Sequence, residues 1–314
     1  MNDAVLVAVG GNSLIRAGQR GTVREQAENA RATASHIADL AALGFGLVIT
    51  HGNGPQVGAQ LLRSEAGASQ TYTQPLDVCV AATQGELGYV LQNALRSELR
   101  ERGITAPVAT IVTQVRVEIR DPAFREPTKP VGPFYHKDEA ERRHDELGWH
   151  VVEDAARGYR RVVPSPRPVE IVEIDAIRRC IQDGIIVIAV GGGGIPVVSE
   201  DGATKGVEAV IDKDLSSALL ASELGIKMMV ISTDVDYVYV NFRKSGERSL
   251  RLLTMEEAAA YLEDGQFAAG SMRPKISSAV EFLSHGGEEV VITSPSHLAD
   301  AVRGDFGTHI RKGD

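Results

Sequence analysis

Short apolar runs bounded by glycine alternate with longer amphipathic segments along most of the chain, and this alternation limits the fold more than any other feature. The runs are rich in Val and Ile, which is typical of strands buried on both faces of a parallel sheet. Such strands are predicted at residues 5–9, 46–50, 108–112, 185–190, 228–232 and 290–293. Apolar residues that recur at helical intervals predict helices at residues 24–43, 81–102, 175–183, 213–224, 255–263 and 274–284. Strands that alternate with helices predict a layered α/β fold.

The stretch from residue 115 to residue 168 breaks this rhythm. It holds many of the prolines of the chain, dense charge and the aromatic residues Phe134, Tyr135 and Trp149. Neither a repeat nor a linker divides the rest of the sequence. We therefore predict one domain over residues 1–314 with an inserted, protruding subdomain, or lid, at about 115–168.

Net charge excludes several classes of partner. The sequence has 33 basic and 42 acidic residues, a formal net charge of −9, which argues against nucleic acid and anionic membranes as partners. Its two cysteines, Cys79 and Cys180, lack the spacing of a zinc site, so no metal bound by protein ligands is predicted. The N-terminal apolar run is too short for a signal peptide or a membrane span. We expect a cytoplasmic protein.

Three predicted strands end in glycine-rich turns, at residues 7–12 (VAVGGN), 49–54 (ITHGNG) and 188–194 (IAVGGGG). In open parallel sheets ligands bind beyond the carboxyl ends of the strands, where glycine lets backbone N–H groups approach a phosphate or carboxylate. One such turn alone is usually only a tight turn, whereas three predict one anion-binding edge. The P-loop and dinucleotide-binding motifs are both absent. His51 is a candidate base or a residue that hydrogen-bonds the backbone.

Lysine is scarce in this chain, which has 8 Lys and 25 Arg. Three of the lysines have unusual settings: Lys129 lies between prolines, Lys213 lies between Asp212 and Asp214, and Lys275 follows a Gly-Ser turn. Each one alone is compatible with a solvated surface lysine, and one aspartate is explained by capping a helix. Together with the glycine turns, however, compact ammonium groups suit the neutralisation of a phosphoryl group in transfer.

Several motifs in this order give the chain a resemblance to the carbamate kinases of the amino acid kinase superfamily along nearly its whole length. They are GGNSL (10–14), THGNGPQVG (50–58), DPAFREPTKPVGPFY (121–135), GYRRVVPSPRP (158–168), GGGGIPV (191–197), KGVEAVIDKDLSS (205–217), TDVDYVYVNF (233–242), GQFAAGSMRPK (265–275) and GTHI (307–310). The resemblance implies an open αβα sandwich with a mainly parallel sheet. It also implies a homodimer, a place in arginine metabolism, and reversible phosphoryl transfer between ATP and carbamate that gives ADP and carbamoyl phosphate, with Mg²⁺ on the nucleotide.

The resemblance also implies roles for particular residues. Lys129, Lys213, Asp214 and Lys275 would be catalytic, with Asp214 orienting the lysines and Lys275 also reaching the nucleotide phosphates. The acceptor and the moving phosphoryl group would lie against Gly10, Gly11, Asn12, Gly52 and Asn53. The nucleotide would contact Asp212, Asp234, Tyr237, Val238, Ser271 and Met272.

Three departures from the family pattern are visible. Ser13 follows GGN where alanine is usual, Ala269 stands where proline is common, and the loop at 243–253 is atypical. None of them replaces a lysine or aspartate that has an implied role. Two other functions stay open at this point: a kinase of another small carboxylate on the same fold, and a catalytically weak nucleotide-binding sensor.

Overall fold

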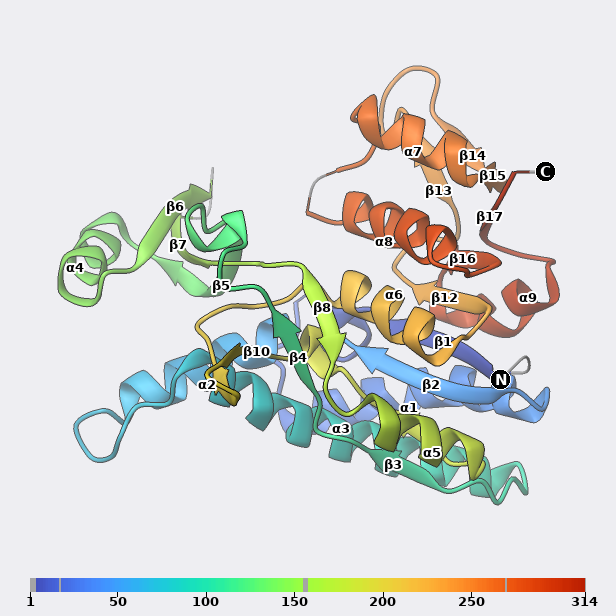
Figure 1. The fold of residues 1–314 in the computed structure, drawn as a ribbon, viewed down its shortest axis with the longest axis horizontal. Helices are drawn as coiled ribbons and strands as arrows, with labels where there is room; N and C mark the ends of the chain where they lie inside the picture. Colours follow the sequence, from blue (N-terminus) through green and yellow to red (C-terminus); the bar gives the residue numbers. More distant parts are fainter. Residues whose placement is uncertain (1–3, 17, 155–157, 269, 314) are drawn as a thin grey trace.

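An eight-stranded sheet forms the centre of the computed structural model, which describes residues 4–16, 18–154, 158–268 and 270–313. The strand order is β15-β17-β16-β12-β1-β2-β9-β3, and all neighbours run parallel except β16 and β17 (Figure 1). The strands are β1 (Ala4–Val9), β2 (Gly46–His51), β3 (Val108–Thr110), β9 (Ile186–Ile188), β12 (Met228–Ser232), β15 (Leu252–Thr254), β16 (Glu289–Thr293) and β17 (Thr308–Arg311).

The six predicted strands are the contiguous parallel part of this sheet, from β16 to β3. Their Val and Ile side chains are covered on both faces, and every residue of β1 is buried. Helices supply the covering layers. The predicted αβα sandwich with a mainly parallel sheet is thus confirmed.

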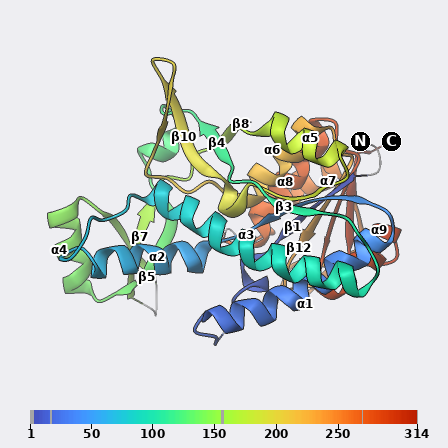
Figure 2. The same cartoon turned by 90° about the horizontal axis from the view of Figure 1, so that it is seen from below.

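Helices on one face of the sheet are α1 (Val23–Ala42), α3 (Leu76–Glu101) and α9 (Leu298–Arg303), and those on the other face are α5 (Ile174–Gln182), α6 (Lys213–Leu224) and α8 (Met272–Ser284) (Figure 2). Ile37 of α1 and Leu87 of α3 pack into the hydrophobic core on the first face, and Leu220 of α6 and Phe282 of α8 pack into the core on the second face. Within the described part of the chain, no helix is long and apolar enough to cross a membrane.

Outside the main sheet, the described residues form three smaller sheets. These are β11-β10-β4-β8, β13-β14 and β5-β7-β6. Their strands are β4 (Gln114–Val117), β5 (Lys129–Tyr135), β6 (His150–Asp154), β7 (Gly158–Val163), β8 (Pro168–Ile171), β10 (Ile195–Glu200), β11 (Ala203–Gly206), β13 (Val238–Val240) and β14 (Arg248–Leu250). The remaining helices are α2 (Gly54–Ala66), α4 (Lys137–Leu147) and α7 (Met255–Glu263), with short 3-10 turns η1 (Gly11–Ser13), η2 (Pro122–Phe124), η3 (Gly191–Gly193) and η4 (Pro295–His297).

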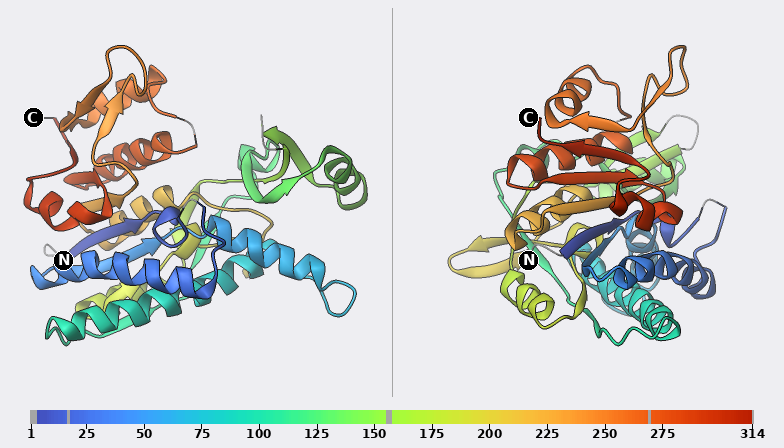
Figure 3. Two further views of the ribbon diagram at one scale, coloured as in Figure 1. Left: turned by 180° about the vertical axis from the view of Figure 1, so that it is seen from behind. Right: turned by 90° about the vertical axis from the view of Figure 1, so that its right-hand side faces the viewer.

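The protruding subdomain, defined here as residues 129–154 and 158–163, projects beyond the main body as the β5-β7-β6 sheet with α4 (Figure 3). The two ends of the stretch predicted at about 115–168 are not part of this sheet. There, β4 and β8 pair with each other, and β4 also pairs with β10. Val115 and Val117 of β4 are buried in the main core. The part that projects is therefore narrower than the irregular stretch of the sequence.

Two arginines of the protruding subdomain form ion pairs with the body, in addition to the pair between Lys129 and Asp212. Arg143 of α4 bonds Glu65 at the end of α2, with 2.6 Å between Nη1 and Oε2, and its guanidinium lies 4.6 and 4.8 Å from the ring centres of Tyr135 and Trp149. Arg161 of β7 pairs with Glu208. Because the Arg143 guanidinium contacts both aromatic rings and also bonds Glu65, this side chain ties the subdomain core to α2.

Candidate active site

A hollow of about 380 Å³ lies beyond the carboxyl ends of β1 and β2, and residues of the protruding subdomain and of the beginning of α8 line it. Glycine turns form its floor, the subdomain contributes Lys129 and Arg160, and α6 and α8 contribute their first turns. The structure brings together here, from the sequence predictions, Gly10, Gly11, Gly52, Asn53, Lys129, Asp212, Lys213, Asp214, Asp234, Ser271 and Lys275. Asn12 lies in η1, and its side chain is outside the described part of the structure.

Asp214 is the centre of the charged groups in this hollow. Lys213 Nζ donates to its Oδ1 at 2.7 Å, and Lys275 Nζ donates to its Oδ2 at 3.0 Å. Burial by itself would raise the pKa of the Asp214 carboxyl, but the two ammonium groups outweigh burial and hold the pKa at about 2. Burial, together with the nearby charge of Lys275, lowers the pKa of Lys213, while Asp214 opposes that shift. The result is a compact buried group of two cations and one anion.

Asp212 has two separate contacts. Its Oδ1 accepts the backbone N–H of Asp214 at 2.9 Å and so caps α6, as a residue at this position commonly does. Its Oδ2 accepts Lys129 Nζ at 2.8 Å, which links the start of β5 to the start of α6. The two aspartates around Lys213 are thereby explained, because one caps the helix and holds Lys129 while the other holds Lys213 and Lys275.

The glycine turns approach one another too closely for side chains. A Cβ atom on Gly52 would lie 3.1 Å from the backbone nitrogen of Gly11 and 3.5 Å from Cδ of Lys213. A Cβ atom on Gly193 would collide with the carbonyl oxygen of Ile211, just before α6. The turns are therefore packed against each other and against the segment that carries Lys213, which leaves backbone N–H groups close to the ammonium groups.

His51 is part of the scaffold of these turns. Its ring is 1% exposed, Nδ1 lies 3.1 Å from the carbonyl oxygen of Gly52, and Nε2 lies where a Cβ of Gly191 would be. Burial lowers the pKa of His51 to about 4. The ring is thus neutral near pH 7 and packs between two turns, as expected for the alternative in which His51 hydrogen-bonds the backbone.

A second hollow, of about 530 Å³, adjoins the first and shares Thr233, Asp234 and Ser271 with it. Met272, predicted at the nucleotide, lines this second hollow. Sequence reasoning missed several other lining residues, which come from β13, the segment after it and the turn before α8: Tyr239, Asn241, Phe242, Lys244, Gln266 and Phe267. Ala269 lies outside the described residues.

Tyr237 and Val238 are not brought to this second hollow. Val238 begins β13, is fully buried, and donates its N–H to Thr308 Oγ1. Tyr237 packs against Phe306 with ring centres 5.0 Å apart and lines a different hollow. The aromatic residues of this motif that line the adjoining hollow are Tyr239 and Phe242.

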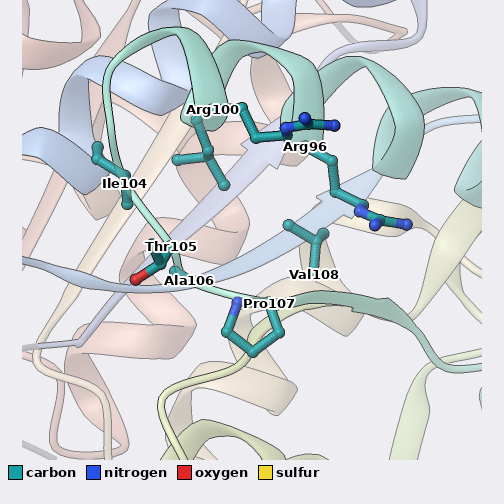
Figure 4. A pocket seen from close by; sticks show the side chains of 8 residues that line it. Arg96, Arg100, Ile104, Thr105, Ala106, Pro107 and Val108 are labelled. Atoms are coloured by element: carbon teal, nitrogen blue, oxygen red, sulfur yellow. The ribbon is translucent and has the colours of Figure 1, made fainter.

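Another hollow, of about 300 Å³, lies at the opposite end of α3 from the glycine turns. Arg96 and Arg100 come from the last turns of the helix, and Thr105 to Val108 come from the chain that leads into β3 (Figure 4). None of the residues predicted for the site lines it. This hollow is therefore separate from the edge where the glycine turns meet the lysines.

Known proteins resemble this chain over its whole length. The sequence profile of the amino acid kinase family matches residues 3–294. Carbamate kinases of Pyrococcus horikoshii and Thermococcus kodakarensis are 49% and 50% identical, over 99% and 98% of this chain and of their own lengths. A solved carbamate kinase of Giardia lamblia bound to AMP-PNP superposes with a TM-score of 0.94 at 42% identity, covering 99% of both chains. This chain is therefore a kinase that belongs to the carbamate kinases, within the amino acid kinase family.

Proposed function

We propose that this protein catalyses reversible phosphoryl transfer between carbamoyl phosphate and ADP, which gives carbamate and ATP. The observation that carries the proposal is the meeting of Lys129, Lys213 and Lys275 with two glycine turns in one hollow, which adjoins a second hollow large enough for a nucleoside. The likeness to carbamate kinases adds the identity of the acceptor.

The reaction needs alignment and charge neutralisation rather than proton transfer. An oxygen of the ADP β-phosphate attacks the phosphorus of carbamoyl phosphate, the bond from phosphorus to the carbamate oxygen breaks, and carbamate leaves as an anion. Lys213 and Lys275, held by Asp214, stabilise the charge on the moving phosphoryl oxygens, and Lys129 approaches from the acceptor side. N–H groups of the turns at Gly10–Gly11 and Gly52–Asn53 bind the remaining oxygens. No covalent intermediate with the protein is required.

Mg²⁺ is proposed to enter on the nucleotide. Both carboxylates at the start of α6 are already engaged by lysines, and the described residues contain no group of three or more His, Cys, Asp or Glu that would hold a metal ion. Such surroundings fit an ion that is coordinated by phosphate oxygens and water. When bound, it would neutralise charge on those phosphates.

The protruding subdomain is proposed to act as a lid over the acceptor. Its support is the position of Lys129 at the root of β5, where the ammonium group lines the hollow and bonds Asp212. Arg160 of β7 lines the same hollow and adds a second subdomain cation. We further propose a homodimer from the likeness to the family, which light scattering of the purified protein tests.

The reaction is tested by ATP formation. Purified protein with Mg²⁺, ADP and carbamoyl phosphate should produce ATP in a coupled luminescence assay, and a protein without this activity would refute the proposal. Other carboxyl phosphates, such as those of amino acid derivatives, are assayed in parallel. A higher kcat/KM with one of them would replace carbamate as the acceptor, and ADP binding by calorimetry without turnover would indicate a nucleotide sensor.

A further inference from the structure

Two buried polar residues of α3, Thr83 and Gln84, form hydrogen bonds to the turns that carry Asn53 and Gly191. Thr83 and Gln84 are 0% and 2% exposed and lie on a helix whose other buried residues are mainly apolar. Buried polar groups of this kind are kept only with their hydrogen bonds made. The partners of Thr83 and Gln84 therefore show what the two residues hold.

The Gln84 side chain uses three hydrogen bonds to hold the turn after β9. Its Oε1 accepts the backbone N–H of Thr113 at 2.8 Å, and its Nε2 donates to the carbonyl oxygens of Thr113 at 3.1 Å and Gly191 at 2.9 Å. The amide thereby joins the segment before β4 to the first glycine of the GGGG turn.

The turn that Gln84 holds has an unfavourable backbone. Val190 has φ +52° and ψ +36°, a left-handed conformation that a β-branched residue rarely adopts, and Gly192, Gly193 and Gly194 also have positive φ. Thr113 Oγ1 accepts the N–H of Val190 at 3.0 Å. A conformation of this kind persists only where the surrounding bonds enforce it, and Gln84 and Thr113 supply them.

Thr83 holds the other turn. Asn53 Nδ2 donates to Thr83 Oγ1 at 2.8 Å, and the Asn53 side chain packs against Gly192, where any Cβ would collide with it. The GGGG turn in its own right contacts α6, because Ser216 Oγ donates to the carbonyl oxygen of Gly193 at 2.7 Å. Consecutive residues of one helix thus fix both turns relative to each other and to the helix that carries Lys213.

We propose that Thr83 and Gln84 are positioning residues for phosphoryl transfer, which set the relative placement of the turns at 52–54 and 191–194 and, through them, of Lys213. The inference rests on the proposed function for its kinetic readout. The adjoining hollow is built mainly from residues 233–244 and 264–272, elements distinct from α3, so nucleotide affinity should depend little on this pair. Misplacement of the turns should therefore lower kcat while KM for ADP changes little.

The test uses isosteric variants with matched controls. Gln84→Met keeps the length of the side chain and removes its three bonds, and Gln92→Met makes the same change two turns further along α3, where Gln92 bonds Thr110 of β3. Thr83→Val removes the acceptor of Asn53, whereas Thr83→Ser keeps it. For each variant, kcat and KM for ADP are measured with saturating carbamoyl phosphate, and backbone hydrogen exchange is measured for residues 190–194.

Gln84→Met and Thr83→Val are expected to lower kcat by about 10- to 100-fold with KM within about threefold of wild type, while Thr83→Ser and Gln92→Met stay within about twofold of wild type in kcat. Faster exchange at residues 190–194 is expected in Gln84→Met and not in Gln92→Met. Folded Gln84→Met with wild-type kcat and wild-type exchange would overturn the inference. If wild type forms no ATP, the proposed function fails and the exchange data alone decide the positioning role. If Gln84→Met does not fold, Thr83→Val against Thr83→Ser decides it.

Discussion

Replacement of Lys213 by alanine separates catalysis from folding most clearly. Lys213 Nζ bonds Asp214 Oδ1 at 2.7 Å, and its side chain is 14% exposed. In Lys213→Ala the Asp214 carboxylate keeps Lys275 at 3.0 Å. The buried anion is therefore still paired, and its removal from water is still compensated.

The expected magnitudes follow from that difference. Loss of one charge that stabilises a transition state is typically worth ~3 kcal/mol or more, which corresponds to a fall of about 100-fold or more in kcat. Leaving a buried charge without its partner costs roughly 3–5 kcal/mol of stability. Lys213→Ala should not incur this cost, because Lys275 remains paired with Asp214. Asp214→Ala, by contrast, leaves two ammonium groups facing each other without an anion. It should lose both activity and stability.

The assay is ATP formation at saturating substrates, combined with urea unfolding of the same preparations. Lys205→Ala is the matched control, since Lys205 is an exposed lysine whose ion pair with Glu200 lies in the β10-β11 hairpin. It should leave both quantities unchanged. A folded Lys213→Ala protein with wild-type kcat would refute the reasoning. A stability loss in Lys213→Ala as large as that in Asp214→Ala would show that Lys275 does not compensate.

Three further predictions concern the scaffold. The pKa of His51 is about 4 in the folded protein against an ordinary value near 6.5. The contribution of neutral His51 to the free energy of unfolding should therefore be fully present above pH 6.5 and should fall by about 3 kcal/mol as the pH drops towards 4. Urea titrations in which His51→Gln shows the same dependence of unfolding free energy on pH would contradict this. Trp149 is the sole tryptophan of the sequence and packs on Arg143, so Arg143→Ala should shift its emission to the red and lower kcat/KM, and unchanged emission would argue against that packing. Cys79 is fully buried and burial raises its pKa to about 11, so Ellman's reagent should titrate at most Cys180 in the native protein and both thiols after unfolding.

The main sheet and the charged centre were predictable because their signals are local. Runs such as β1 are apolar on both faces, and the lysines at 213 and 275 lie in short motifs beside helix starts. Most of the strands that sequence reasoning missed are short or partly exposed: β15 has three residues, and β5 has an irregular pattern of burial. For such strands the pairing partner decides the structure, and the partner is remote in sequence.

Residues of the site were missed for a similar reason. Arg160 is one of 25 arginines, and only the pairing of β7 with β5 places it in the hollow beside Lys129. Tyr239 and Tyr237 stand in the same motif, and the point at which β13 begins decides which of them lines the adjoining hollow. Nothing in the local sequence distinguishes Gln84 from other helix residues, because its partners Thr113 and Gly191 are remote in sequence.

Asp212 makes two independent contacts at the start of α6. One of its carboxylate oxygens caps the start of the helix, and the other accepts the ammonium group of Lys129. The two contacts are therefore separable although they share one side chain. Loss of the contact with Lys129 would leave the helix cap, on the other carboxylate oxygen, in place beside Lys213. The start of α6 therefore does not depend on the contact between Asp212 and the protruding subdomain for its helix cap.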